Sequence, residues 1–180
     1  MDESGVLLSP LVRRTLAPKG ETPILLHKAK DREKVSLLAA LTISPKRQHL
    51  GLYFTSLAND SFDNVAVAFM LRQLLKHLRG PVIIVCDRGP MHRGPDIRKL
   101  LEDYPRLTLE YLPAYAPELN PVEQVWKYLK WTRLCNFAPK DLSHLDQVVF
   151  QELDDIRFDH KRLRSFWEAS ELPWPHAFAS

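Results

Sequence analysis

The 180-residue sequence is 45% hydrophobic and 26% charged, with a formal net charge of +3, which is ordinary for one globular domain with a substantial core. Its two cysteines, Cys86 and Cys135, lack metal-type spacing, which excludes a disulfide scaffold, and no apolar run approaches the roughly 20 residues that cross a membrane. The beginning, MDESG, has no basic region followed by an apolar stretch, so we expect no signal peptide, no membrane partner and a cytoplasmic protein.

The hydrophobic pattern predicts strands first and then helices that alternate with strands. The predicted strands cover 2–8, 35–43, 49–57, 81–87 and 107–112, the second and third forming a hairpin across SPKRQ. The predicted helices run from a cap at Asn59, Asp60 or Ser61 to about Leu78, over 95–103, from Pro121 to about Leu134, and over 141–156, before a polar and aromatic tail. This order indicates an α/β mixed sheet covered by helices in a single domain, 1–180, with a C-terminal helical extension at about 141–180.

The stretch LPAYAPELNPVEQVW (112–126) places a glutamate in the first turn of a helix after a proline-rich approach. Asn120 is a good N-cap, and Pro121 suits the first helical position. Glu123 can serve a capping box or pair with Lys127, one turn on. It also borders the apolar stripe of this helix, so its carboxylate can instead point along the sheet toward another acidic group.

Two further carboxylates are candidates for chemistry. Asp87 directly follows the continuously apolar strand 81–87, at the strand end where open α/β sheets bind ligands, although it can also simply start a turn with Gly89. Asp2 and the adjacent Glu3 are equally compatible with solvated surface positions. Three converging carboxylates repel one another unless cations neutralise them, and carboxylate oxygens prefer hard ions such as Mg²⁺ or Mn²⁺.

Four stretches, in order, resemble the catalytic domain of DDE-type transposases, in particular the mariner-like insertion-sequence transposases of bacteria. They are DESG (2–5), APKGETP (17–23), IIVCDRGPMH (83–92) and LPAYAPELNPVEQVWKYLK (112–130). The last is the most specific, because the family pattern is close to LPxYSPxLNPIE followed by W. The 35 residues between Asp87 and Glu123 match the short gap of this branch. The resemblance covers most of 2–135.

The resemblance implies a ribonuclease-H-like fold, with a five-stranded mixed sheet flanked by helices. It makes Asp2, Asp87 and Glu123 the catalytic acids, which would hold two Mg²⁺ or Mn²⁺ ions. The implied function is a DDE superfamily endonuclease and strand transferase of an insertion sequence, which cuts and joins DNA phosphodiester bonds in transposition. Its partners would be DNA, as transposon ends and a TA target, and a second copy or another chain that carries helix-turn-helix domains. A nucleoid-associated location in bacteria follows.

Cations near the acids are the expected contacts to the DNA backbone, with solvated surface positions as the alternative. They are Arg88, Arg93, Lys127, Lys130, Arg13, Arg14 and Lys19. His92 can touch phosphate or approach a metal, but we expect a hydrogen-bonded surface histidine there. Trp126 is expected in the core rather than as a stacking platform, and Trp131, Trp167 and Trp174 receive no role.

The sequence departs from the family in three ways. Arg88 replaces the asparagine that often follows the second acid, and Leu16 replaces an aromatic residue. The N-terminal helix-turn-helix domains are absent from the 180 residues, which is typical of a split reading frame or a truncated element. Two alternatives therefore stay open: an inactive remnant that folds and binds DNA or a full-length partner, and a nuclease of the same fold that acts on RNA–DNA hybrids.

Overall fold

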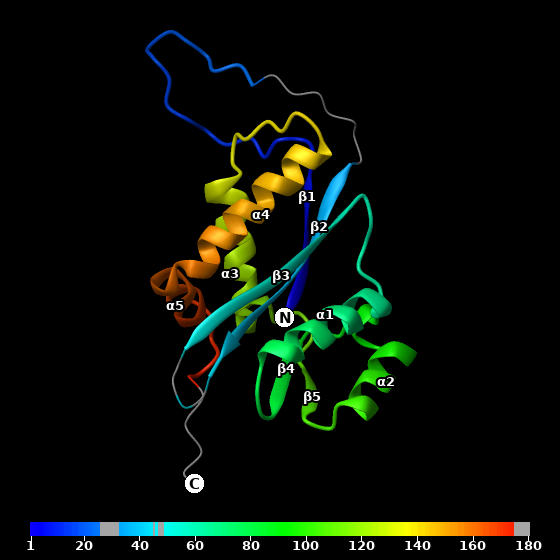
Figure 1. Cartoon of the computed structure of the whole chain (residues 1–180). Helices are drawn as coiled ribbons and strands as arrows, with labels where there is room; N and C mark the ends of the chain where they lie inside the picture. Colours follow the sequence, from blue (N-terminus) through cyan, green and yellow to red (C-terminus); the bar gives the residue numbers. More distant parts are fainter. Residues whose placement is uncertain (26–32, 45, 47–48, 175–180) are drawn as a thin grey trace.

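Strands dominate the first third of the chain, and helices alternate with strands after it (Figure 1). The computed structural model describes residues 1–25, 33–44, 46 and 49–174. The strands are β1 (Asp2–Leu7), β2 (Lys34–Ile43), β3 (Leu50–Ala58), β4 (Val82–Cys86) and β5 (Leu107–Tyr111). The α-helices are α1 (Asn64–His77), α2 (Pro95–Asp103), α3 (Pro121–Tyr128), α4 (Leu142–Phe158) and α5 (His160–Glu168). Short 3-10 turns cover Pro90–His92 (η1) and Pro117–Leu119 (η2), and Leu129–Arg133 (η3) is π-helical.

Antiparallel and parallel pairing both occur among the strands. The strands β1, β2 and β3 form an antiparallel sheet in which Ala39 lies between Asp2 and Phe54, whereas β4 and β5 pair in parallel. The Met1 amine links the two sheets by donating a hydrogen bond to the Val85 carbonyl at 2.7 Å. The predicted α/β fold with five strands of mixed direction is confirmed, but the hydrogen bonds divide the strands into two sheets rather than one.

The strand β2 is the centre of the core, because it is buried on both faces. Side chains of a strand alternate between faces. Leu37 and Ala39 accordingly pack among α3, α4 and α5, whereas Leu38 and Ala40 pack with α1, α2, β4 and β5. Figure 1 shows the two groups of helices on opposite sides of the long strands. The end of β1 that carries Asp2 therefore lies where both halves of the core meet.

The start of α1 differs from the sequence prediction. Asp63 is the N-cap, and its carboxylate accepts a hydrogen bond at 2.8 Å from the backbone N–H three residues on. The predicted caps Asn59, Asp60 and Ser61 are wrong because they belong to the turn that ends β3. Asn59 has a φ of 52° there and accepts a hydrogen bond from the Lys34 N–H. Several neighbouring residues could each cap a helix, and the turn decides which one does.

The C-terminal third also extends beyond the prediction. The helix predicted from Pro121 to Leu134 is α-helical only to Tyr128 and continues as η3. The predicted tail contains α5, which buries Leu163, Phe166 and Trp167 against the core. Of the predicted hairpin turn at 44–48, positions 45, 47 and 48 lie outside the described residues, as do positions 175–180 of the predicted extension.

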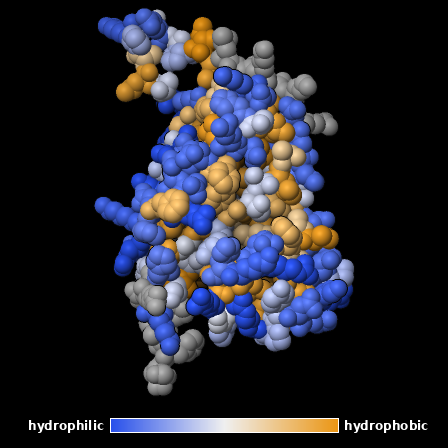
Figure 2. Space-filling model, in the orientation of Figure 1, coloured by the Kyte–Doolittle hydropathy of each residue, from blue (hydrophilic) through white to orange (hydrophobic). Residues whose placement is uncertain are grey.

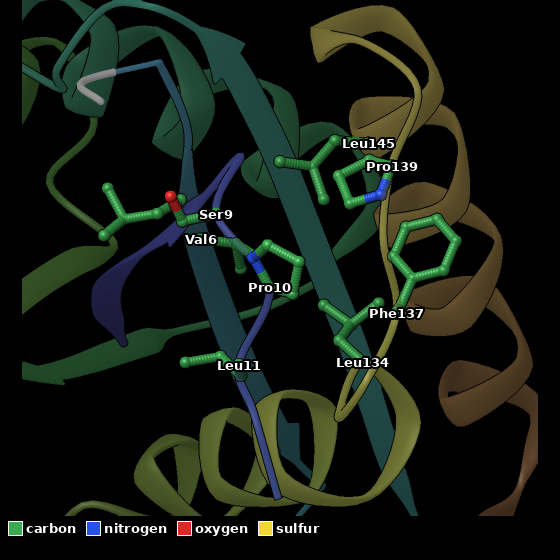
Figure 3. Close-up of a pocket in the computed structure, with 9 residues that line it drawn as sticks. Val6, Ser9, Pro10, Leu11, Leu134, Phe137, Pro139 and Leu145 are labelled. Carbon is green, nitrogen blue, oxygen red and sulfur yellow. The ribbon is translucent and has the colours of Figure 1, made fainter. Parts of the chain in front are cut away.

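The face in Figure 2 is mostly hydrophilic, with apolar side chains in patches along its middle. A small, mainly apolar hollow lies where the segment after β1 meets the end of η3 and the start of α4, lined by Val6, Pro10, Leu11, Leu134, Phe137 and Leu145 (Figure 3). It is at the end of β1 opposite Asp2, away from the predicted acids. None of the helices in the described ranges is long and apolar enough to cross a membrane.

Candidate active site

Asp2 opens β1 and points into the protein rather than into solvent. Strand alternation sends Asp2 toward α3 and the next residue, Glu3, to the opposite face. The Asp2 side of the strand is closed, and the residue is only 8% exposed. Trp126 on α3 donates a hydrogen bond from Nε1 to Asp2 Oδ2 at 2.9 Å. The interpretation of Asp2 as a solvated residue is therefore wrong.

Glu123 lies in the first turn of α3, as its capping sequence predicts. Asn120 is the N-cap and accepts a hydrogen bond from the Val122 N–H at 3.2 Å. The Asn120 N–H is used by the Pro117 carbonyl, so the Glu123 side chain does not complete a capping box. Within the described residues its carboxylate has neither a hydrogen bond nor an ion pair, including with Lys127. The carboxylate is therefore available for a ligand.

The charge of Glu123 acts on the buried Asp2. Burial raises the pKa of Asp2 to about 7, and the negative charge of Glu123 adds to that rise. The Met1 ammonium group and the Trp126 hydrogen bond oppose it. Lys130 lies beside the pair: its Nζ donates to Ser4 Oγ at 2.7 Å, and burial lowers its pKa against the opposing pull of both acids. We call Asp2 and Glu123 the strained pair, because burial and the charge of Glu123 disfavour the ionised form of Asp2.

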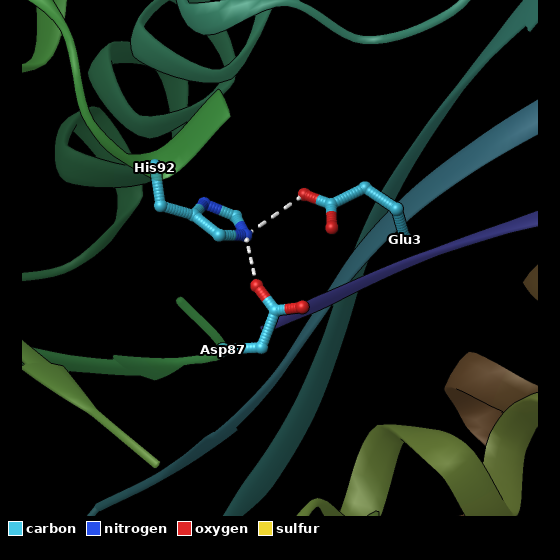
Figure 4. A group of neighbouring side chains, drawn as sticks. All are labelled: Glu3, Asp87 and His92. Atoms are coloured by element: carbon cyan, nitrogen blue, oxygen red, sulfur yellow. Dashed lines mark ion pairs between the residues drawn. The ribbon is translucent and has the colours of Figure 1, made fainter. Parts of the chain in front are cut away.

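Asp87 follows β4 and is held in a tight turn. Its Oδ1 accepts a hydrogen bond from the Gly89 N–H at 2.8 Å, which confirms the turn interpretation. The same oxygen lies 3.2 Å from His92 Nε2, which in turn lies 3.2 Å from Glu3 Oε1 (Figure 4). A turn role and a role in chemistry are therefore compatible at Asp87. Its Oδ2 has no hydrogen bond among the described residues.

His92 differs most from expectation. We predict a hydrogen-bonded surface histidine, yet the side chain is 1% exposed and neither ring nitrogen has a hydrogen bond among the described residues. Glu3, expected in solvent, has a side chain only 17% exposed. The missed signal is the position of His92 in the short η1 turn after Asp87, which folds its ring back toward the strand end.

The acids gather at one end of the strands in two groups. Asp2 pairs with Glu123, and Asp87 pairs with Glu3 and His92. The buried Met1 amine feels the charges of both groups. Burial lowers its pKa, whereas the negative charges of Asp2, Glu3 and Asp87 raise it. The Met1 amine therefore lies near Asp2, Glu3 and Asp87, but among the described residues the acid or histidine group with ligand atoms within 4.8 Å of one another is Glu3, Asp87 and His92, not the three predicted acids.

Comparison with known proteins identifies the family of this chain. The family model described as DDE superfamily endonuclease matches residues 1–146. The chain belongs to this family. The uncharacterized protein y4pE/y4sA of Sinorhizobium fredii (strain NBRC 101917 / NGR234) is 31% identical over 74 residues, which are 41% of this chain and 44% of that protein.

Solved structures share the fold of this DDE-family chain. The Mos1 strand transfer complex aligns with a TM-score of 0.60 at 16% identity, over 93% of this chain and 48% of that one. The mariner Mos1 paired end complex with Mg aligns with a TM-score of 0.60 at 17% identity, over 94% and 52%. The paired end complex with Mn gives 0.57 at 14% identity, over 94% and 54%. The ribonuclease-H-like α/β fold is thereby confirmed, and the chain spans about half the length of these proteins.

The predicted DNA-binding cations of this DDE-family chain lie in two places. Arg88, Arg93 and Lys127 are exposed near the acids, and the Arg93 guanidinium lies 5.3 Å from the centre of the Tyr111 ring. The segment with Arg13, Arg14 and Lys19 is exposed at the opposite end of β1 from Asp2 (Figure 1), where the Arg13 side chain donates to the Trp131 carbonyl. The second set is therefore remote from the acids, and DNA contact stays a prediction for both.

Trp126 is buried, as predicted, and its hydrogen bond to Asp2 can be tested by substitution. Replacing it with Phe removes the donor to a buried carboxylate, so we expect the free energy of unfolding to fall by about 2 kcal/mol at about pH 8, beyond the loss of packing. Chemical denaturation measures this change. Trp167→Phe is the matched control, because Trp167 is also buried but its Nε1 has no partner within the described residues. Equal costs for the two variants would show that the hydrogen bond to Asp2 contributes nothing.

Proposed function

We propose that the chain is the catalytic part of a transposase that cuts DNA and joins the freed 3′ ends to a new site. The observation that carries the proposal is the buried Asp2, paired electrostatically with Glu123, in a chain of the DDE superfamily endonuclease family. The strained pair gains stability when a cation binds. Asp87, at the same strand end, supplies the third acid.

The residues fit hard divalent ions. Asp2, Asp87 and Glu123 offer carboxylate oxygens, the ligands that Mg²⁺ and Mn²⁺ prefer, and the related Mos1 complexes are described with Mg and with Mn. Two such ions, held by the three acids, would activate water at a phosphodiester bond and stabilise the departing 3′ oxygen. Because the pKa of Asp2 is raised to about 7, ionised Asp2 destabilises the fold, and bound cations would offset that destabilisation.

The chain's own groups orient these acids. The Trp126 N–H holds Asp2 Oδ2, and the Gly89 N–H holds Asp87 Oδ1, which leaves Asp87 Oδ2 for a ligand. Ligands fixed in this way lose little freedom when they bind. The π-helical segment η3 carries Lys130 to the Asp2 side, where it limits the negative charge.

DNA is the proposed substrate. The Mos1 structures are described as strand transfer and paired end complexes, and we extend that role to this chain, with transposon ends and a TA target as substrates. Arg88, Arg93 and Lys127 are exposed beside the acids and would contact backbone phosphates without reading sequence. A second copy, or a partner with helix-turn-helix domains, would supply recognition of specific ends.

A plasmid assay tests the proposal. The purified chain is incubated with supercoiled plasmid and Mg²⁺ or Mn²⁺, and nicked circles are measured on a gel. We expect nicking with either ion and none with EDTA. Competition with an RNA–DNA hybrid distinguishes the alternative nuclease, because a transposase prefers duplex DNA. Nicking that persists in EDTA, or preference for the hybrid, would contradict the proposal.

A second candidate function is DNA binding without cleavage. The observation that favours it is the position of Asp87, whose Oδ1 lies 3.2 Å from His92 and which belongs to a different group from Asp2. In that case gel mobility shifts occur with labelled duplex DNA, but no nicking follows at any Mg²⁺ or Mn²⁺ concentration.

Gly89→Ala tests the role of the turn that holds Asp87. A Cβ at Gly89 would lie 2.9 Å from Asp87 Oδ1 and 2.5 Å from Met91 Sδ, so the Asp87 carboxylate has to move. We expect the nicking rate to fall roughly a hundredfold, since small displacements of reacting groups carry penalties of that size. Gly5→Ala is the control, because the nearest atom to a Cβ there is the Val35 carbonyl oxygen at 3.9 Å. An unchanged rate in Gly89→Ala would show that the turn does not position Asp87.

A further inference from the structure

The group formed by Glu3, Asp87 and His92 is not explained by the three proposed catalytic acids. We propose that these residues form a zinc-type metal site. It has Asp87 in common with the proposed catalytic site but does not include Asp2 or Glu123. The site joins β1, the end of β4 and η1, three segments far apart in sequence (Figure 4).

Two of the three distances between the ligand atoms are those found around one small ion, and the third lies within 4.8 Å. His92 Nε2 lies 3.2 Å from Glu3 Oε1 and 3.2 Å from Asp87 Oδ1, and the ligand atoms all lie within 4.8 Å of one another. Ligand atoms about 2.0 to 2.1 Å from a tetrahedral Zn²⁺ are about 3.3 Å apart. Figure 4 shows the Nε2 edge of the ring turned toward both carboxylates. A small inward adjustment suffices to bind an ion.

Hydrogen bonding does not account for this arrangement. His92 is 1% exposed, and Glu3 Oε1 and both ring nitrogens are buried without a hydrogen bond among the described residues. Apart from the ion pairs that His92 Nε2 forms with both carboxylates when the ring is protonated, these buried atoms have no partner among the described residues. Buried polar atoms so poorly partnered are costly, so they point to a ligand. Asp87 Oδ1 accepts one hydrogen bond, from the Gly89 N–H, and a carboxylate oxygen keeps a further lone pair for a metal.

The donor set selects the ion. One imidazole nitrogen and two carboxylate oxygens suit Zn²⁺, which binds such sites more strongly than Mn²⁺ in the usual order of divalent metals. Mg²⁺ demands octahedral oxygen ligands and keeps its waters, so it is a poor competitor for His92. Asp2 and Glu123 themselves offer carboxylate oxygens rather than an imidazole nitrogen. We therefore expect the site with His92 to prefer zinc over magnesium.

A consequence for regulation rests on the proposed function. Zinc held by Glu3 and His92 would engage Asp87 and withdraw it from the Asp2–Glu123 site. We therefore expect micromolar-range zinc, added in the presence of Mg²⁺, to inhibit nicking by the wild-type chain. Inhibition is a secondary readout, since it requires an active nuclease.

Calorimetry tests the site independently of nuclease activity. The tag-free chain with Asp2→Asn and Glu123→Gln is titrated with Zn²⁺ in excess Mg²⁺, so that Asp87 remains while the other two acids are neutral. We expect one Zn²⁺ per chain, and at least a tenfold weaker affinity when His92→Gln or Glu3→Gln is added. His77→Gln is the control, because His77 is exposed on α1 and should leave the affinity unchanged.

Nitrogen-15 NMR of the imidazole rings removes dependence on a buried variant that fails to fold. In the wild-type chain, one equivalent of Zn²⁺ should shift the His92 Nε2 resonance to a metal-bound position while the Nδ1 resonance changes little. No change at His92, or zinc affinity that His92→Gln and Glu3→Gln leave intact, would overturn the proposal. Zinc binding at His92 in a chain that does not nick DNA would instead contradict the proposed function alone.

Discussion

Glu123→Gln is expected to abolish Mg²⁺- and Mn²⁺-dependent nicking of supercoiled plasmid, lowering the rate at least about a thousandfold. Bound divalent ions contribute several kcal/mol to stabilising the transition state, and each 1.4 kcal/mol is about a factor of ten in rate. The amide has nearly the shape of the carboxylate but lacks the charge that binds a cation. Since the Glu123 carboxylate has no hydrogen bond within the described residues, and its charge disfavours ionised Asp2, the variant should fold at least as stably as the wild type. Initial rates of nicked-circle formation measure the effect.

Asp87→Asn should have the same effect, because Asp87 offers the proposed ligand at the end of β4. Each variant has a matched control at an exposed position: Glu118→Gln in η2 for Glu123, and Asp103→Asn in α2 for Asp87. Both controls should nick at the wild-type rate. If Glu123→Gln or Asp87→Asn also nicks at that rate, the two acids are not the catalytic groups.

Asp2→Asn is expected to remove activity and, in contrast to most buried substitutions, to stabilise the metal-free fold. Burial and the charge of Glu123 raise the pKa of Asp2 to about 7, so ionised Asp2 destabilises the folded chain. We expect the free energy of unfolding to rise by roughly 2 to 4 kcal/mol at about pH 8. The amide oxygen can still accept the Trp126 hydrogen bond.

The stability difference between Asp2→Asn and the wild type should depend on pH. Between about pH 4 and about pH 7 the folded chain holds a proton on Asp2 that the unfolded chain has released, so the contribution of Asp2 to stability falls as the pH rises. Below that window both states are protonated, and above it the penalty is constant. The difference between Asp2→Asn and wild type should therefore be small at about pH 4, grow through the window and level off above it.

Urea denaturation across this pH range, without divalent ions, measures the difference. Asp103→Asn, at an exposed position, should follow the wild-type curve throughout. Saturating Mg²⁺ at high pH should stabilise the wild type and not Asp2→Asn, because a ligand stabilises only the state that binds it. Asp2→Asn that is no more stable than wild type at high pH would mean that Asp2 carries no electrostatic strain.

Local sequence signals predict part of the candidate site well. The cap at Asn120 and the prolines around it determine where α3 begins, so they place Glu123 in its first turn without tertiary information. The continuous apolar run before Asp87 likewise indicates a buried strand and places Asp87 at its end. Both acids depend on rules that act within a few residues.

The surroundings of Asp2 and His92 depend on long-range packing. Asp2 is buried because α3, more than a hundred residues later, places Trp126 against it. His92 is buried because η1 folds back onto Glu3, almost ninety residues earlier in the sequence. The pattern around either residue is too short to specify these contacts. The helix α5 falls within the helical extension predicted at about 141–180, but the sequence does not give its bounds, because its short apolar face is recognisable only from its packing against the core.

Diffraction from crystals grown with Mn²⁺ tests most directly whether Asp2, Asp87 and Glu123 bind divalent cations together. The anomalous signal of manganese locates each ion without assumptions about the ligands. We predict manganese about 2 Å from carboxylate oxygens of all three acids, with Asp87 turned from His92 toward Asp2. Ordered Asp2 and Glu123 side chains with no manganese beside them, at Mn²⁺ concentrations that saturate the crystals, would contradict the account.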